Sequence, residues 1–361
     1  MSKSKYYDGT KLLSLKDING NQPEIYICTS NRSAGKTTYF ARLLVNKYRK
    51  YGIKFMLIYR FNYELDSVSE KFFKDIQKLF FPDLLMKHEK RARGMFAELY
   101  IAPKPDNDEP YDEKNLPWES CGYAISLNSA DNIKKYSHFF SDVGYMMFDE
   151  FQSETNKYCP DETTKFISVH TSVARGNGEQ TRYVPVFMVS NPVTILNPYY
   201  VDMGISNRLD NKVKFLRGTG FVLEQGYNES ASKAQEMSAF NRAFSNHKYV
   251  AYASQSIYLN DNKAFIEKPY GNSRYIATLK YMGTEYGIRE FPDMGIIYCD
   301  DRPDKDYYNK ISVTTDDHDI NYVMLKTNEI FLNGLRYYFD RGCFRFKNLK
   351  CKEVILTALS Y

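Results

Sequence analysis

Residues 30–37, Ser-Asn-Arg-Ser-Ala-Gly-Lys-Thr, constrain the fold of this chain more than any other segment. They follow a short apolar run at 25–28 and precede a stretch with helical character at 38–51. A strand, a tight loop ending in Gly-Lys-Thr and a helix form the context that a phosphate-binding P-loop requires. Backbone N–H groups of such a loop and the helix dipole both favour bound phosphate. The predicted ATP-binding residues are Ser30, Asn31, Arg32, Ser33, Ala34, Gly35, Lys36, Thr37 and Thr38.

Two residues of this loop have specific predicted roles. Lys36 can reach the β- and γ-phosphates of a nucleotide, and the Thr37 hydroxyl can ligate Mg²⁺. Ser30 stands where the consensus has glycine, so the match is incomplete. The alternative is a glycine-containing turn that caps a helix and leaves Lys36 on the surface.

A second motif, Val-Gly-Tyr-Met-Met-Phe-Asp-Glu, occupies residues 143–150. An apolar run that ends in two carboxylates is typical of a Walker B strand. Asp149 is then predicted to hold Mg²⁺ opposite Thr37, and Glu150 to orient and deprotonate an attacking water. The alternative is a buried strand whose terminal acids are solvated. A glutamate beside the metal aspartate favours an ATP hydrolase over a small-molecule kinase.

A third apolar segment, residues 184–189, ends in Ser190-Asn191. A polar side chain at this strand end, Asn191 in particular, can contact the γ-phosphate or the water. An ordinary turn before Pro192 is an equal alternative.

Arg175 lies between the second and third apolar segments, on a loop flanked by Gly176 and Gly178, and Arg182 follows it. An arginine at this place can reach the nucleotide of a neighbouring subunit and stabilise transition-state charge. A solvated loop arginine is the default alternative.

Further motifs, in a consistent order along most of the chain, carry a specific resemblance. They are Tyr-Tyr and Lys-Leu-Leu-Ser within 6–14, the loop 30–37, Met-Phe-Asp-Glu-Phe at 147–151, Val-Ala-Arg at 173–175, Val-Ser-Asn-Pro and Asn-Pro-Tyr-Tyr within 189–200, Phe-Ile-Glu-Lys at 265–268, and Ser-Val-Thr-Thr-Asp-Asp at 312–317. On these motifs the chain resembles the DNA-packaging (encapsidation) ATPases of phi29-like short-tailed phages.

The resemblance implies a catalytic set that uses ATP and Mg²⁺. Lys36 and Thr37 would bind the phosphates and the metal, Asp149 the metal, and Glu150 would be the catalytic base. Arg175 would act as an arginine finger in a neighbouring subunit.

The resemblance also shows departures in and near the loop. Arg32 stands at the arginine of the family's phosphate-binding loop, whereas Ser30 and Ser33 replace family glycines, so the loop φ angles can differ. Asn62 stands at a family lysine that acts between subunits, and the neighbouring Arg60 is the candidate to replace it.

The assembly is likewise implied by the resemblance. It would be a homo-oligomeric, pentameric ring that translocates double-stranded DNA into a procapsid, with a packaging RNA and the portal vertex as partners. The protein would act in the cytoplasm of the infected bacterial host, transiently on the procapsid, and would be absent from the mature virion.

Composition agrees with a soluble globular protein of about two domains for 361 residues. The net charge of +5 is compatible with nucleic-acid binding without requiring it. Six cysteines without a Cys-x-x-Cys pair argue against zinc and a disulfide scaffold, and for a reducing cytoplasm. The amino terminus lacks the apolar core of a signal peptide, and no apolar run approaches the roughly 20 residues of a membrane span.

Element patterning predicts the domain organisation. Residues 1–207 alternate between strands and helices, which predicts a mostly parallel sheet covered by helices. Together with the motifs at 30–37 and 143–150, we expect an α/β P-loop ATPase domain of the ASCE class. Residues 208–247, with a helical pattern at 228–246, are predicted to be a linker or lid. The alternative is that this helix is the last helix of the first domain. Residues 248–361 read as short strands followed by helices, a small α+β domain that resembles RNase H-like nucleases in arrangement only.

The C-terminal domain carries carboxylates that could in principle bind two metals, at Asp300, Asp301, Asp316, Asp317 and Asp319. A turn and a solvated helix start are the stronger interpretation. The resemblance implies a vestigial nuclease domain used for binding, without nuclease activity.

Two basic clusters are candidates for contact with nucleic acid. The first holds Lys87, Lys90, Arg91 and Arg93, and the second, interleaved with aromatic residues, holds Arg336, Arg341, Arg345, Lys347, Lys350 and Lys352. Such stretches suit phosphate contacts and base stacking. A solvated charged face is an equal alternative for each cluster.

Three functions compete. The leading hypothesis is an ATP-driven double-stranded DNA translocase. A helicase-like ATPase lacks support because no helicase motif series follows residue 150. A non-catalytic nucleic-acid-binding protein with a degenerate P-loop conflicts with the intact Lys36, Thr37, Asp149 and Glu150.

Overall fold

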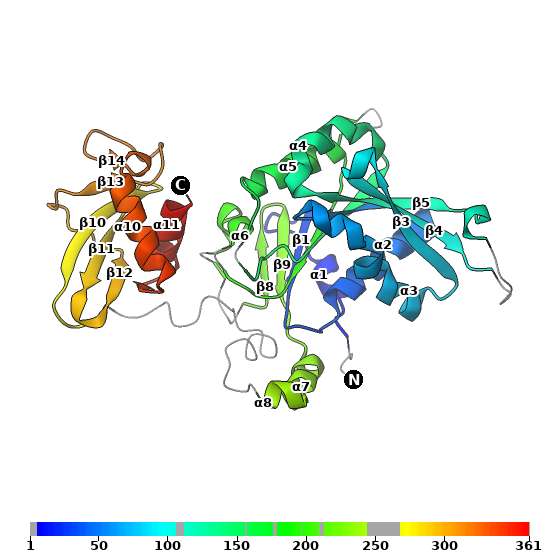
Figure 1. The fold of residues 1–361 in the computed structure, drawn as a ribbon, viewed down its shortest axis with the longest axis horizontal. Coiled ribbons are helices and arrows are strands. Elements are labelled where there is room, and N and C mark those ends of the chain that lie inside the picture. The colour runs from blue at the N-terminus through cyan, green and yellow to red at the C-terminus, as the bar shows by residue number, and fades with distance from the viewer. Residues whose placement is uncertain are drawn as a thin grey trace. The chain divides into compact units, whose positions relative to one another are not determined.

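Apolar strands that alternate with amphipathic helices build a first sheet of nine strands in a computed structural model (Figure 1). The structure describes residues 6–105, 112–155, 157–175, 179–195, 197–206, 208–209, 213–243 and 268–360. The chain forms two compact units, one of residues 1–193 and 210–259, the other of residues 194–209 and 260–361. The domain boundaries expected at 207 and 247 stay predictions.

The sheet of the first unit has the strand order β3-β4-β5-β2-β6-β7-β1-β9-β8. Its six central strands run parallel, from β5 through β2, β6, β7 and β1 to β9. The predicted mixed α/β fold with a mostly parallel sheet is thereby confirmed. The strands are β1 Ile25–Thr29, β2 Lys54–Tyr59, β3 Leu84–Arg91, β4 Phe96–Pro103, β5 Glu119–Ser126, β6 Val143–Asp149, β7 Val186–Ser190, β8 Phe215–Gly218 and β9 Phe221–Gln225.

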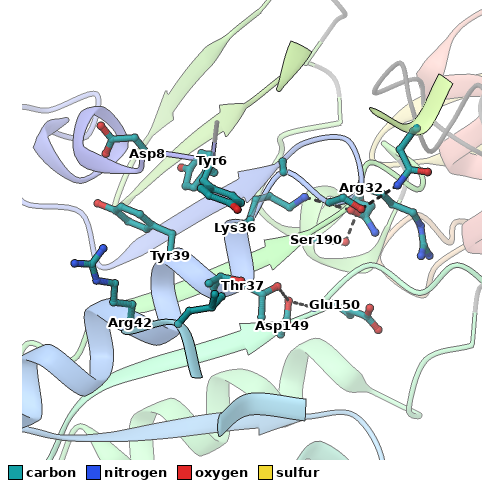
Figure 2. A pocket seen from close by; sticks show the side chains of 18 of the residues that line it. Tyr6, Asp8, Arg32, Lys36, Thr37, Tyr39, Arg42, Asp149, Glu150 and Ser190 are labelled. Carbon is teal, nitrogen blue, oxygen red and sulfur yellow. Dashed lines mark hydrogen bonds between the residues drawn. The ribbon is translucent and has the colours of Figure 1, made fainter. Parts of the chain in front are cut away.

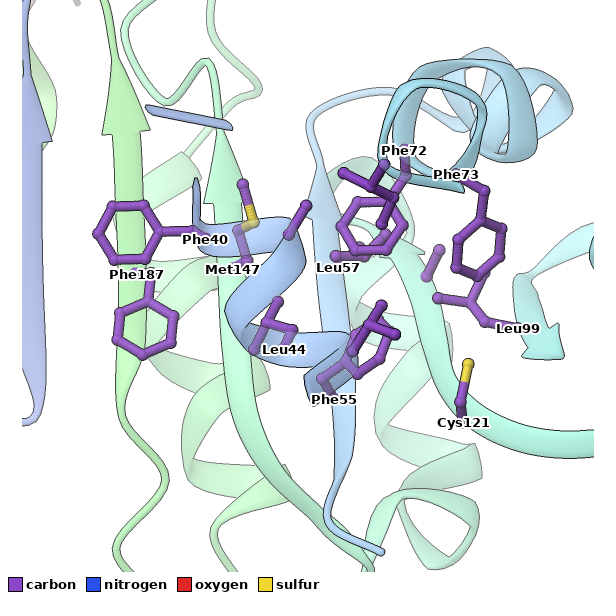
Figure 3. Packing of buried hydrophobic residues seen from close by; sticks show 14 of the residues in the cluster. Phe40, Leu44, Phe55, Leu57, Phe72, Phe73, Leu99, Cys121, Met147 and Phe187 are labelled. Atoms are coloured by element: carbon purple, nitrogen blue, oxygen red, sulfur yellow. The ribbon is translucent and has the colours of Figure 1, made fainter. Parts of the chain in front are cut away.

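Helices cover both faces of this sheet because its central strands are apolar on both sides. From α2, Phe40 stacks on Phe187 of β7 with ring centroids 4.9 Å apart, and Figure 3 shows Leu44 beside Phe55 of β2. On the opposite face Phe148 of β6 lies 6.0 Å from Phe166 of α5. The helices are α1 Thr10–Ser14, α2 Lys36–Tyr51, α3 Lys74–Phe80, α4 Ala130–Ile133, α5 Glu162–Val173, α7 Glu229–Met237 and α8 Ala239–Ala243.

The segment expected to be a linker contains two strands of this sheet. β9 pairs in parallel with β1, from Ile25 opposite Phe221 to Thr29 opposite Gln225, and β8 pairs antiparallel with β9. The apolar residues Phe221, Val222 and Leu223 are buried there, which explains why they extend the sheet instead of forming a connector. The helical part of the prediction corresponds to α7 and α8, and residues 244–246 lie outside the described residues.

The second unit has a six-stranded sheet in the order β14-β13-β10-β11-β12-β15. The three successive strands β10, β11 and β12 form an antiparallel meander, and β13 joins β10 in parallel. The elements are α6 Pro198–Asp202, β10 Arg274–Tyr281, β11 Thr284–Phe291, β12 Ile296–Asp300, β13 Lys310–Ser312, β14 Val323–Met324, α10 Glu329–Asp340, β15 Phe344–Phe346 and α11 Leu349–Leu359. The likeness to RNase H stays a prediction. Within the described residues, no helix has the length and apolar character needed to cross a membrane.

Candidate functional site

The loop after β1 makes the tight turn that the sequence predicted. Gly35 precedes α2 with a φ of 88°, and Ser33 has a φ of 61°. A left-handed conformation at a residue with a Cβ atom costs about 1–2 kcal/mol. Ser33 therefore adopts the backbone conformation that a glycine would favour, at some cost in stability.

The Lys36 side chain folds back into this loop. Its ammonium donates to the Ser30 carbonyl at 2.9 Å, the Ser30 hydroxyl at 3.0 Å and the Asn191 side-chain oxygen at 3.2 Å. Lys36 is only 6% exposed, and this burial lowers its pKa to about 8. The alternative of a lysine on the surface therefore does not describe this structure. An anion that enters the loop would stabilise the charged form of this buried lysine.

The two Walker motifs meet at the carboxyl edge of the sheet. The Thr37 hydroxyl donates to Asp149 Oδ1 over 3.1 Å, and the Glu150 N–H donates to the same oxygen over 3.0 Å. Burial, followed by the charge of Glu150, raises the pKa of Asp149 to about 6. A half-buried carboxylate beside a hydroxyl fits a hard divalent cation such as Mg²⁺, which prefers oxygen ligands and would offset this charge.

These groups line a pocket of about 920 Å³, a volume at the upper end of that of small-molecule sites. Figure 2 shows Lys36, Thr37, Asp149 and Glu150 along it. Asn191, at the end of β7, also lines it, because β7 lies between β1 and β6 in the sheet. The pocket is lined by Tyr6, Tyr7, Asp8, Arg32, Ser33, Ala34, Gly35, Lys36, Thr37, Thr38, Tyr39, Arg42, Leu79, Phe80, Asp149, Glu150, Ser190, Asn191, Gln235 and Asn241.

Three loop residues contact elements beyond the loop itself. The Asn31 side chain makes a reciprocal pair with the backbone of Asn228, at 3.0 and 2.9 Å. Arg32 forms an ion pair with Glu154, which follows β6. Gln235 of α7 donates to the Ser33 hydroxyl over 3.0 Å, a contact that the sequence did not reveal because the partners are 202 residues apart.

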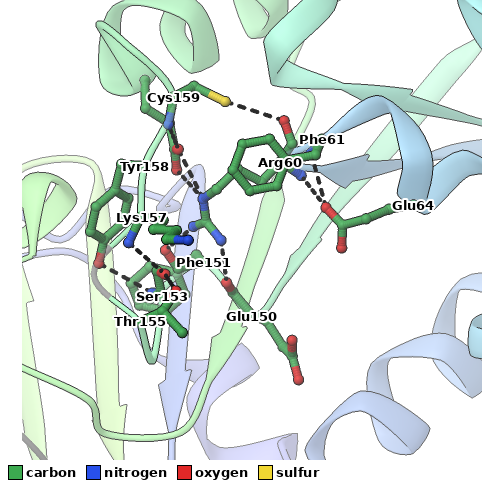
Figure 4. A network of polar contacts seen from close by, with 11 residues as sticks. Arg60, Phe61, Glu64, Glu150, Phe151, Ser153, Thr155, Lys157, Tyr158 and Cys159 are labelled. Atoms are coloured by element: carbon green, nitrogen blue, oxygen red, sulfur yellow. Dashed lines mark hydrogen bonds and ion pairs between the residues drawn. The ribbon is translucent and has the colours of Figure 1, made fainter.

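Glu150 stands on a backbone that Arg60 holds in place (Figure 4). Glu150 has a φ of 53°, and the Arg60 guanidinium donates to the Glu150 carbonyl at 3.3 Å and to the Phe151 carbonyl at 2.7 Å. The Glu162 carboxylate, at the start of α5, forms an ion pair with Arg60 Nε at 2.9 Å. Arg60 is 8% and Glu162 3% exposed. These contacts lie within one chain, which does not fit the role between subunits considered for Arg60.

Asn62, the other residue considered for that role, also has partners in its own chain. Its side-chain oxygen accepts hydrogen bonds from the hydroxyls of Ser126 and Ser129.

We expect Arg60→Met to destabilise the first unit by about 3–5 kcal/mol, because it leaves Glu162 buried without its cation. The variant should also hydrolyse ATP more slowly, since the carbonyls of Glu150 and Phe151 each lose the donor that holds this segment in place. Urea unfolding and ATP turnover measure the two effects. The matched control is Arg49→Met, which removes an ion pair with Asp83 whose side chains are 41% and 56% exposed and should cost at most about 1 kcal/mol. Equal stability of the two variants would contradict the role of Arg60.

Arg175 is not brought into the pocket of its own chain. It follows α5, which returns from the end of β6 to the beginning of the parallel strand β7. A five-residue strand such as β7 spans about 17 Å, so the exposed Arg175 lies at the sheet edge opposite Asn191. The neighbouring Arg182 instead donates to the Val173 carbonyl at 2.7 Å and the Val143 carbonyl at 3.1 Å. Gly176 and Gly178 lie outside the described residues.

The first basic cluster lies on β3 and the turn after it, with much of its charge paired. Lys87 pairs with Glu89 at 2.8 Å, Arg91 with Glu98 at 2.9 Å, and Lys90 with Asp66. Arg93 lies in the turn. A solvated hairpin therefore accounts for this cluster, and its contact with nucleic acid stays a prediction.

In the second cluster, Lys352 is only 6% exposed, which does not favour the contact with nucleic acid expected for this residue. It lies on α11 beside the buried Cys351 and Val354. Lys350 and Arg341 are exposed, with Arg341 3.5 Å from the centre of the Tyr337 ring. Arg336, Arg345 and Lys347 are half-buried.

Four of the C-terminal carboxylates have structural partners. Asp300 pairs with Arg289 at 3.1 Å, Asp319 with Lys280 at 2.7 Å, and Asp301 with Lys347. Asp317 accepts the N–H groups of Met282 and Gly283 at 2.9 and 2.8 Å. In the part of the chain that the structure describes, no cluster of three metal-ligating side chains occurs.

Comparisons with known proteins agree over most of the chain. A family model described as Podovirus DNA encapsidation protein (Gp16) matches residues 111–359. The DNA packaging protein of Bacillus phage phi29 is 25% identical over 358 residues, 98% of this chain and 97% of that protein. The DNA packaging protein of Bacillus phage B103 is 22% identical over 326 residues, 87% of this chain and 92% of that protein.

Two solved structures are similar along nearly the whole chain. One, of the bacteriophage Phi-29 viral genome packaging motor assembly, has a TM-score of 0.59 at 24% identity and covers 98% of this chain and 100% of its own. The other, of the Phi-28 gp11 DNA packaging motor, has a TM-score of 0.60 at 15% identity and covers 99% of each chain. At these identities the two likenesses show a shared fold.

Proposed function

Because the chain belongs to the Podovirus DNA encapsidation protein (Gp16) family, we propose that it is an ATP-driven motor that moves double-stranded DNA into a viral procapsid. One observation carries the proposal most directly. Lys36, Thr37 and Asp149 converge on one pocket at the carboxyl edge of a parallel sheet. The order β2-β6-β7-β1 separates the two Walker strands by one strand, which supports the ASCE class.

We assign each of the main polar side chains of the pocket one role in ATP hydrolysis. Lys36 would stabilise the negative charge of the β- and γ-phosphates, and Asn191 would contact the terminal phosphate or the attacking water. Thr37 and Asp149 would hold Mg²⁺, which neutralises charge on the phosphate oxygens when bound. Glu150 would accept the proton of the attacking water, since its carboxylate lines the pocket beside Asp149.

The transition state needs a cation besides Lys36, and we infer that Arg175, which does not line the pocket of its own chain, would supply it to a neighbouring subunit. The position of Arg175 favours a ring-shaped oligomer. It lies at the edge of the sheet opposite its own pocket, so it would contact the nucleotide of the next subunit through a head-to-tail interface. We propose a pentamer that works on the portal vertex with a packaging RNA, in the cytoplasm of the infected host and transiently on the procapsid. The second unit would bind nucleic acid or the procapsid without cutting DNA.

ATP turnover by the full chain, with and without DNA, tests this function. We expect turnover that double-stranded DNA stimulates, and Lys36→Ala should abolish it because the phosphates lose their buried cation. Stimulation by single-stranded DNA alone would favour a helicase-like ATPase. Nucleic-acid binding without any turnover would favour a non-catalytic binding protein.

A further inference from the structure

The pocket continues well beyond the phosphate-binding loop. Figure 2 shows Asp8, Tyr39 and Arg42 at one end, and Asp149 and Glu150 at the other. From Lys36 to Arg42 the helix α2 rises about 9 Å, a length that the sugar and base of a nucleotide can span when its phosphates rest at Lys36. Whatever binds its phosphates at Lys36 therefore presents its other end to the Asp8 side.

This end has flat surfaces suited to a nucleobase. Tyr6, Tyr39 and Phe80 line it together with Arg42, whose guanidinium lies 4.4 Å from the centre of the Phe80 ring. Aromatic rings and arginine planes stack on bases with little regard to sequence, so these groups supply affinity for a base without selecting among bases. Selection requires a hydrogen-bonding group that is fixed in position.

Asp8 is such a group because the residues around it are anchored. The Tyr7 N–H donates to the Ala34 carbonyl at 2.8 Å, and the Tyr7 hydroxyl donates to Glu224 at 2.8 Å. The Tyr7 ring meets Tyr39 edge-on at 5.5 Å. Gly9 lies so close to Tyr39 that a Cβ atom there would be 2.6 Å from its ring. The segment of residues 6–9 is thus seated on the loop and on the first turn of α2.

One of the two Asp8 carboxylate oxygens is already used. Asp8 Oδ1 accepts the Thr10 N–H at 2.9 Å and the Thr10 hydroxyl at 2.6 Å. None of the hydrogen bonds among the described residues uses Oδ2. The side chain therefore offers one acceptor, held in a set orientation at the wall of the pocket.

A single anionic acceptor distinguishes purines by their 6-substituent. The amino group of adenine is a donor, whereas the 6-oxygen of hypoxanthine or guanine is an acceptor that a carboxylate repels. Guanine can also donate through two adjacent N–H groups, but pairing with both needs two free carboxylate oxygens, and here Thr10 uses one.

We propose that the Asp8 end of the pocket binds the nucleobase, and that Asp8 selects adenine by accepting a hydrogen bond from its exocyclic amine. The inference rests on the proposed function, because it assigns the base of the nucleotide whose phosphates Lys36 would bind. The segment of residues 6–9 is then the element that sets nucleotide selectivity.

The test compares ATP with inosine triphosphate and with purine riboside triphosphate, which lacks the 6-amino group. Equilibrium binding of each to the full chain is measured by calorimetry in the presence of Mg²⁺, with turnover as a second readout. The wild-type chain should bind both analogues about tenfold or more weakly than ATP, the usual worth of a hydrogen bond to a charged group. Asp8→Asn should bind inosine triphosphate more tightly than the wild-type chain does, because the asparagine amide can donate a hydrogen bond to the 6-oxygen.

The matched control is Asp131→Asn, which removes a charge at an 83% exposed side chain outside the pocket and should leave the preference for ATP unchanged. Equal wild-type affinity for ATP and purine riboside triphosphate would overturn the proposal, and this comparison does not depend on whether the variant folds. Selectivity that survives Asp8→Asn unaltered would overturn it as well. In both cases normal ATP turnover would leave the proposed function standing, whereas the absence of ATP binding would refute that function itself.

Discussion

Glu150→Gln should bind ATP as the wild-type chain does and hydrolyse it about 10²–10⁴-fold more slowly, the usual worth of a positioned general base. Glutamine keeps the size of the side chain and leaves the backbone contacts of residue 150 with Arg60 in place. Its amide cannot accept the proton of the attacking water. Binding would be measured by calorimetry and hydrolysis by phosphate release from the full chain.

Two controls separate this loss from a general effect of removing a charge near the pocket. Glu119→Gln changes an exposed acid at the start of β5, outside the pocket, and should hydrolyse ATP at the wild-type rate. Lys36→Ala should lose affinity as well as rate, because it removes the cation on which the phosphates would rest. Wild-type turnover by Glu150→Gln would refute the assignment of this residue as the base.

Local patterns were sufficient to predict the carboxyl edge of the sheet. The runs before Ser30, Asp149 and Ser190 are apolar and short, and parallel strands bring their carboxyl ends to one edge, so the three loops had to meet. The sequence also marked the tight turn at Gly35. The predicted phosphate end of the site therefore follows from motifs whose meaning does not depend on distant partners.

Non-local pairing explains what the sequence did not reveal. β9 was expected in a linker because its partner β1 precedes it by almost 200 residues, at Ile25 opposite Phe221. Arg60 was the candidate for a role between subunits, yet its partner Glu162 lies in the same chain, 102 residues away. No sequence motif marks Asp8, because its position depends on the contacts of Tyr7 with Ala34 and Glu224. Each of these roles depends on the tertiary fold and not on a spacing within the sequence.

Mixing two inactive variants, Arg175→Ala and Glu150→Gln, should restore ATP hydrolysis if Arg175 acts on the site of a neighbouring subunit. A guanidinium that stabilises the transferring phosphoryl group contributes about 10³–10⁵ in rate, so each variant alone should be nearly inactive while still binding ATP. The fold places Arg175 after α5, at the edge of the sheet opposite its own pocket, and a finger acting within one chain would have to cross the length of β7.

The mixture discriminates because an interface needs one intact residue from each of its two members. An Arg175→Ala subunit still has Glu150, and a Glu150→Gln neighbour still has Arg175, so one orientation of a mixed interface is complete. In an equal mixture about a quarter of the head-to-tail interfaces should be complete, because each member is drawn with even odds. Activity should peak at equal amounts and vanish at either extreme.

Subunit exchange must be shown separately, and doping wild-type rings with Glu150→Gln reveals whether a ring tolerates an inactive site. If exchange occurs, doped rings keep partial activity and the mixture still stays inactive at every ratio, then Arg175 does not serve a neighbour, and another cation must reach the phosphates.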